Sequence, residues 1–62
     1  MKMKIEIRMD NDAFKRNQTA ALGWILRRLG INIQDGQELR VGDGCNLLDE
    51  NGNVVGEMNV RK

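Results

Sequence analysis

The chain has 62 residues, of which ten are basic and nine acidic, with one cysteine and no histidine. A chain of this length forms one domain that buries about 60% of its unfolded surface, so a single core supplies only about 3–5 kcal/mol. One cysteine excludes an internal disulfide and the lack of histidine disfavours a metal centre, so we expect stabilisation by a homodimer. The near-neutral charge argues against a typical nucleic-acid binder.

No apolar run is long enough for a signal peptide or a transmembrane helix. The lone Cys45 is typical of a reducing compartment. We therefore expect a complete, soluble, cytoplasmic protein with no membrane partner.

The first ten residues alternate between apolar and charged side chains, Met1-Lys2-Met3-Lys4-Ile5-Glu6-Ile7-Arg8-Met9-Asp10. This period of two predicts a half-buried β-strand whose charged side chains face water. The polar run Asp10-Asn11-Asp12 ends the strand, because short polar side chains favour turns and helix caps.

Phe14 is expected to be an apolar plug beneath the entrance of a helix, and residues 15–18 to form a loop or a frayed first turn. Thr19 is a candidate cap for that helix. From Ala20 onward the apolar residues follow a helical period and predict one buried stripe. Its members are Leu22, Ile25, Leu26, Leu29 and Ile33. The helix ends at Gly30 or at Gly36 as a left-handed cap, and Ile33 favours Gly36.

Residues 37–44 suit a connecting loop, and its Gly42-Asp43-Gly44 is not a nucleotide-binding fingerprint because a strand follows it. The segments 45–50 and 53–60 predict a β-hairpin joined by a tight Asn51-Gly52 turn with positive backbone angles. We expect Met3, Ile5, Ile7, the helical stripe and parts of the hairpin to share one core.

The sequence gives little support for a catalytic site or a metal-binding site. Cys45 has no histidine to act as a base, so a buried small apolar residue is the better interpretation. Asp49, Asn51 and Asn53 have the oxygen spacing that opens a calcium loop, but the glycine falls at the wrong position and turn residues explain them better. We expect no enzyme activity, no cofactor and no metal.

Trp24 lies away from the predicted buried stripe. It shares a helix flank with Ala20, Arg27, Arg28 and Ile31. Because tryptophan and arginine are enriched at interface hot spots, this flank is a candidate partner-binding surface. An alternative stays open, in which Trp24 lies across a sheet edge or packs on Phe14 as a boundary residue of the core.

Three segments together resemble small, largely uncharacterised accessory proteins of tailed bacteriophages and prophages. They are Asp10-Asn11-Asp12-Ala13-Phe14, Ile25-Leu26-Arg27-Arg28-Leu29, and Asp49-x-Asn51-Gly52-Asn53-x-Val55-Gly56. The resemblance covers most of the chain and departs at Gly30, where those proteins keep a helix former. It implies a protein of the bacterial host cytoplasm that binds and modulates a host protein, for example as an anti-defence inhibitor, and it carries over no catalytic residue.

The predicted fold is therefore α+β with element order β-α-β-β, in which one helix packs on one face of a mainly antiparallel three-stranded sheet. Strand order 1-3-2 is all antiparallel, whereas order 1-2-3 requires a parallel pair and a crossover. The predicted function is non-enzymatic binding of a host protein. The alternative is a small nucleic-acid-binding protein. It would use six basic residues, namely Lys2, Lys4, Arg8, Arg27, Arg28 and Arg40.

Overall fold

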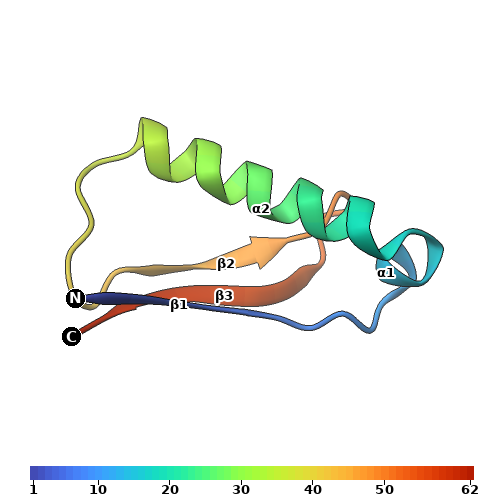
Figure 1. Ribbon diagram of the computed structural model, residues 1–62, viewed down its shortest axis with the longest axis horizontal. Helices are drawn as coiled ribbons and strands as arrows, with labels where there is room; N and C mark the ends of the chain where they lie inside the picture. The colour runs from blue at the N-terminus through green and yellow to red at the C-terminus, as the bar shows by residue number, and fades with distance from the viewer.

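The computed structural model describes all 62 residues as two layers, a sheet and a helical layer on one of its faces (Figure 1). The elements in chain order are β1 (Lys2–Ile7), α1 (Asp12–Arg16), α2 (Gln18–Asp35), β2 (Gly44–Leu48) and β3 (Val54–Arg61). The predicted α+β class is confirmed. The chain ends lie side by side at one end of the sheet, where Lys2 is paired with Arg61.

The sheet has strand order β1-β3-β2 and is antiparallel throughout, as the first of the two predicted orders required. Met3 lies opposite Val60, and Ile5 lies opposite Met58, so these side chains point to the helical face. The intervening charged residues point to the other face, where Lys4 and Glu6 are exposed as predicted.

The helical layer begins with the short helix α1, where the sequence predicts a turn or helix cap followed by a loop or a frayed first turn. The Asn11 carbonyl accepts the backbone N–H groups of Phe14 and Lys15 at 3.1 and 3.2 Å, and Phe14 is buried as predicted. Burial of one aromatic ring thus anchors a helix that is too short to show a hydrophobic period.

Asn17, not Thr19, caps α2. Its side-chain oxygen accepts the backbone N–H of Ala20 at 3.2 Å, which satisfies one of the free donors of the first turn. The helix runs through Gly30 and ends at Asp35, so the later of the two predicted stops is confirmed. Gly36 caps it with an extended backbone (φ −91°), so the predicted left-handed cap is wrong.

The β2–β3 hairpin is confirmed, but its turn is longer than the predicted tight turn. The Asp49 N–H donates to the Asn53 carbonyl at 3.0 Å, and the Gly52 N–H donates to the Asp49 carbonyl at 3.1 Å. Gly52 has φ +85°, and no residue other than glycine has a positive φ. Glu50, Asn51 and Gly52 therefore form a three-residue loop whose last residue alone needs the left-handed region.

The core lies between α2 and the sheet and contains eight buried hydrophobic residues. They are Phe14, Ala21, Ile25, Leu29, Leu47, Val55, Met58 and Val60. Ile25 is the most deeply buried side chain, with 1% of its surface exposed. A core of this size fits the marginal stability expected of a short chain.

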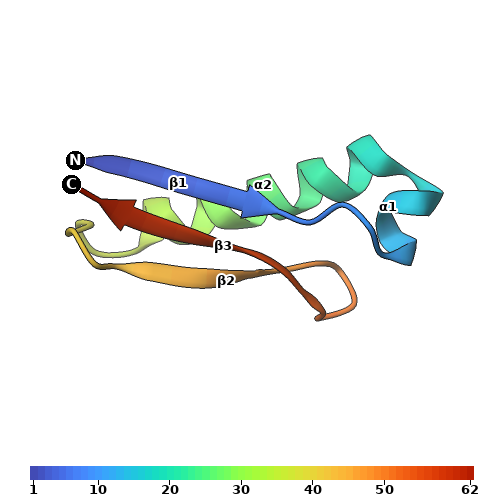
Figure 2. The same ribbon diagram turned by 90° about the horizontal axis from the view of Figure 1, so that it is seen from below.

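Three residues predicted for this core are instead exposed. The exposed fractions are 39% for Met3, 44% for Ile5 and 43% for Leu26, whereas Ile7 and Leu22 are partly buried against the core. The reason is the course of α2, which crosses the sheet obliquely (Figure 2). Figure 1 shows that α2 also rises away from the sheet toward its C-terminal end, and this leaves the N-terminal part of β1 uncovered.

Candidate functional site

Trp24 lies at the boundary of the core, beside the β2 edge of the sheet. The buried face of α2 is centred on Ala21, Ile25 and Leu29, so the tryptophan falls on a flank of the helix rather than on the side opposite the sheet. Its side chain is half-buried and packs against the core. The structure therefore agrees with the alternative in which Trp24 is a boundary residue of the core.

Arg28 lies one helical turn after Trp24, and its guanidinium carbon is 6.0 Å from the centroid of the indole ring. This is the outer limit for an attraction between a cation and an aromatic face. Arg28 is exposed. The pair thus presents a planar aromatic surface and a positive charge at the same place, where α2 meets the hairpin.

Trp24 and Arg28 form one wall of a cavity of about 340 Å³ between α2 and the hairpin. Leu47, Leu48 and Gly52 lie on the opposite wall. Apolar side chains form half of the lining, and the hairpin loop closes one end. We call this cavity, with Trp24 and Arg28, the tryptophan pocket. Its volume is large enough to admit one side chain of a partner.

The other predicted partner-binding residues lie on the neighbouring, solvent-facing stripe of α2. Ala20, Arg27 and Ile31 are exposed, and the exposed fraction of Ile31 is 46%. They extend the surface beside the pocket but do not line it. Of the five predicted residues, the structure brings Trp24 and Arg28 together at one cavity and leaves three on an adjoining helix face.

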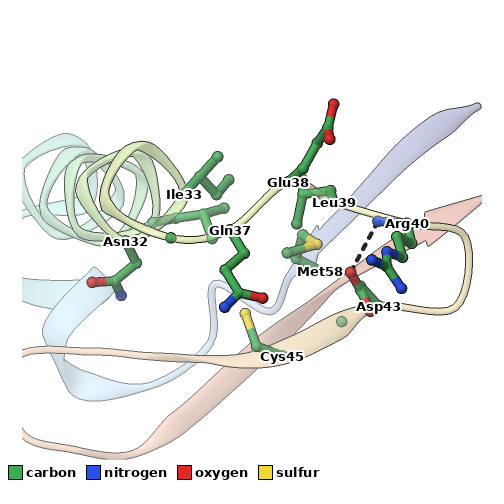
Figure 3. Close-up of a pocket in the computed structure, with 12 residues that line it drawn as sticks. Asn32, Ile33, Gln37, Glu38, Leu39, Arg40, Asp43, Cys45 and Met58 are labelled. Atoms are coloured by element: carbon green, nitrogen blue, oxygen red, sulfur yellow. Dashed lines mark hydrogen bonds between the residues drawn. The ribbon is translucent and has the colours of Figure 1, made fainter.

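A second cavity, of about 470 Å³, lies where α2 ends and β2 begins (Figure 3). The connecting segment 36–43 folds back over it, and Leu39 points toward the buried Met58. The turn of this segment is held by Asp43, whose side chain accepts the Arg40 N–H at 2.9 Å. The sequence pattern predicts only a connecting loop over residues 37–44 and does not indicate the role of Leu39, because a single apolar side chain gives no periodic signal.

Cys45 lies on the rim of this second cavity and is exposed, so its predicted burial is wrong. It faces the helical layer, opposite Met58 in the sheet register. Leu29 and Asn32 of α2 border the same cavity, so an open space rather than a packed side chain lies beside Cys45. The thiol is therefore accessible at the edge of the sheet.

Asp49 is a turn residue, as predicted. Its Oδ1 accepts the backbone N–H groups of Asn51 and Asn53, both at 2.9 Å. Its Oδ2 accepts the side-chain amide of Asn11 at 2.7 Å, which ties the segment after β1 to the hairpin loop. Although only 3% of Asp49 is exposed, its carboxylate is thus supplied with donors on both oxygens.

These hydrogen bonds also set the acidity of the Asp49 carboxyl group. The backbone N–H of Asn53 has the largest effect and holds the pKa of Asp49 below its ordinary value of 3.8, against the opposing effect of burial. The amides of Asn11 and Asn53 and the Asn51 N–H act in the same direction. Asp49 stays ionised at neutral pH as a structural group of the loop.

The basic residues of the nucleic-acid alternative do not lie on one surface. Lys2, Lys4 and Arg8 project from the face of the sheet that carries no helix, where Arg8 is 3.2 Å from Glu57. Arg27 and Arg28 belong to α2 in the other layer. No group of three or more His, Cys, Asp or Glu side chains converges as metal ligands.

Comparison with known proteins finds no matching family model, no similar curated protein and no similar solved structure. The resemblance to phage accessory proteins therefore stays a prediction. Neither helix is both long and apolar enough to cross a membrane.

Proposed function

We propose that this protein is a non-enzymatic accessory protein that binds and modulates a bacterial host protein through the tryptophan pocket. The observation that supports it is the placement of Trp24 and Arg28 at one open cavity, with Arg27 and Ile31 exposed beside it. A half-buried aromatic ring, an adjacent arginine and a receptive cavity are the features that interface hot spots share. The assignment to a phage and to a host target rests on the resemblance of the three sequence segments.

The nucleic-acid alternative is less favoured because its basic residues are divided between the two layers of the molecule. It makes a separate prediction, namely salt-dependent binding of random DNA or RNA. Binding of this kind that is lost when Lys2 and Lys4 are changed to glutamate would support the alternative.

The proposal is tested by capture from bacterial lysate with purified variants. Arg28→Ala changes an exposed residue and should preserve the fold. Trp24→Ala removes a side chain at the core boundary, so its binding is compared with that of wild type at equal concentrations of folded protein. Arg16→Ala, an exposed arginine of α1 outside the pocket, is the matched control. We expect wild type and Arg16→Ala to retain the same protein, and both pocket variants to lose it.

Truncation of a hot-spot residue costs about 2 kcal/mol or more of binding, which weakens affinity about thirtyfold. Direct titration of the captured protein with each variant measures this loss. Equal binding by wild type, Arg28→Ala and Trp24→Ala would remove the pocket from the interface. The absence of any retained protein would count against the proposed function itself.

A further inference from the structure

The free edge of β1 has the outward backbone groups that pairing with another strand requires. β1 ends the sheet on one side, and the Arg8 N–H donates inward to the Val55 carbonyl at 2.7 Å. Val60, opposite Met3, makes its backbone hydrogen bonds to Gly42 and Asp43, on the side away from β1. Since antiparallel strands alternate the direction of their backbone groups, Met3, Ile5 and Ile7 direct their N–H and C=O groups outward.

The other edge of the sheet is less suited to pairing. β2 has only five residues, and its register with β3 shifts between Leu47 and Leu48. Such irregularities discourage edge-to-edge association. β1 has six residues in unbroken register with β3 and is the strand that α2 leaves partly uncovered.

Exposed apolar side chains accompany the β1 edge on the helical side of the sheet. Met3 and Ile5 project from the strand, and Leu26 lies on the flank of α2 opposite the tryptophan pocket. Each of these three residues keeps about two fifths of its surface exposed in the single chain. An additional strand placed against β1 would extend the sheet beneath them and remove part of this surface from water.

We propose that a second copy of the chain occupies this edge, so that two β1 strands pair antiparallel about a two-fold axis and form one continuous sheet. Because only the odd-numbered residues have outward backbone groups, odd residues must lie opposite odd residues. With Ile5 on the axis, Met3 pairs with Ile7 of the second copy. The helices of both copies then lie on the same face, on either side of the joined strands.

Charged side chains on the face of the sheet that carries no helix favour this register over the neighbouring one with Lys4 on the axis. With Ile5 on the axis, Lys4 lies opposite Glu6 of the second copy, and symmetry repeats the pair. With Lys4 on the axis, Lys2 would lie opposite Glu6 of the second copy, but the two Lys4 side chains would lie directly opposite each other with no acidic partner, which is destabilising. The chosen register also sets Lys2 opposite Arg8 of the second copy, but Arg8 is turned to Glu57 of its own chain at 3.2 Å.

The interface is separate from the tryptophan pocket, because β1 and β2 are opposite edges of the sheet. Dimerisation would leave both pockets free at the outer ends of the assembly. The dimer therefore does not depend on the proposed host-protein binding, and each proposal can fail without the other.

Charge reversal on β1 tests the pairing and its register. Lys4→Glu and Glu6→Lys each create like-charged pairs, and symmetry applies each pair twice, so we expect each single variant to raise the dimer dissociation constant about tenfold. The double variant Lys4→Glu/Glu6→Lys exchanges the charges and should restore dimerisation. Arg27→Glu reverses an exposed charge away from β1 and is the control, with the dimer unchanged.

Sedimentation velocity measures the association, and melting temperatures over a range of protein concentrations check it, since a dimer melts at higher temperature as concentration rises. Circular dichroism confirms that each variant is folded. Wild type that sediments as a monomer at high micromolar concentration, with a concentration-independent melt, overturns the proposal. A dimer dissociation constant that the single charge reversals leave unchanged would overturn pairing through β1 in this register. Failure of the double variant to restore dimerisation would overturn it as well.

Discussion

Gly56 is the residue at which the closest approach of two strands leaves no room for a side chain. A Cβ added there would overlap the Glu6 carbonyl oxygen, and it would lie 2.9 Å from the Glu6 carbonyl carbon and 3.0 Å from the Ile7 Cα. All three are backbone atoms of β1, so no rotamer change can relieve the contact. Gly56→Ala must therefore push β1 away from β3, at the end of the ladder where Ile7 pairs with Gly56.

Overpacking of this kind costs about 1–3 kcal/mol. A domain of this size has a total stability of about 3–9 kcal/mol, and each kcal/mol changes its melting temperature by about 4–8 °C. We therefore expect Gly56→Ala to lower the melting temperature by at least several degrees. Thermal unfolding followed by circular dichroism, at one fixed protein concentration, measures the change.

Gly30→Ala is the matched control, because it is the same substitution in a helix with nothing within 4 Å of the added Cβ. Alanine there should stabilise α2 by about 0.5–1 kcal/mol, since glycine is a poor helix former. The two substitutions should thus change the melting temperature in opposite directions. A Gly56→Ala variant as stable as wild type would show that β1 does not approach β3 as described.

Ile25→Ala removes the most buried side chain and should lower the free energy of unfolding, measured with urea, by about 2–5 kcal/mol. Ile31→Ala, on the exposed stripe of the same helix, should change that free energy by no more than about 0.5 kcal/mol. Equal effects of the two substitutions would mean that a different face of α2 packs on the sheet. Gly52→Val should lower the melting temperature markedly, because a β-branched residue is strained at φ +85°, and an unchanged melt would contradict the loop geometry. Asp49 has a lowered pKa in the folded state, so its contribution to stability is complete above its ordinary pKa of 3.8 and is lost as pH falls through the lower folded pKa. Thermal melts over this acidic range should show a decline in wild type that is smaller in Asp49→Asn, and identical pH profiles would refute this role.

The sequence predicted the features that depend on local periodicity. Alternation in residues 1–9 identified β1, and the helical stripe through Ile25 and Leu29 identified the buried face of α2. The Asn51-Gly52 pair located the hairpin, whereas the position of the first strand in the sheet stayed open between two orders until the structure showed β1-β3-β2. These predictions succeed because a period of two or of 3.6 directly determines which side chains share a face.

The features that failed depend on how the layers are placed on each other. Nothing in the pattern of residues 20–35 indicates that α2 crosses the sheet obliquely, so the exposure of Ile5 and Leu26 had no local signal. The cavity that leaves Cys45 exposed at the end of α2 had no local signal either, and neither had the position of Trp24 beside the β2 edge. The helix α1 was missed because its five residues contain one buried side chain and no repeat.

The position of β3 in the sheet has a consequence for the order in which the chain can fold. β3 is both the central strand and the last element in sequence, and β1 and β2 pair with it but not with each other. During synthesis no pair of strands can form until residues 54–61 have been made. Until then the apolar side chains of β1 and α2 have no sheet to pack against. Nascent chains of this protein should therefore stay sensitive to protease until the final strand emerges, rather than gaining protection element by element.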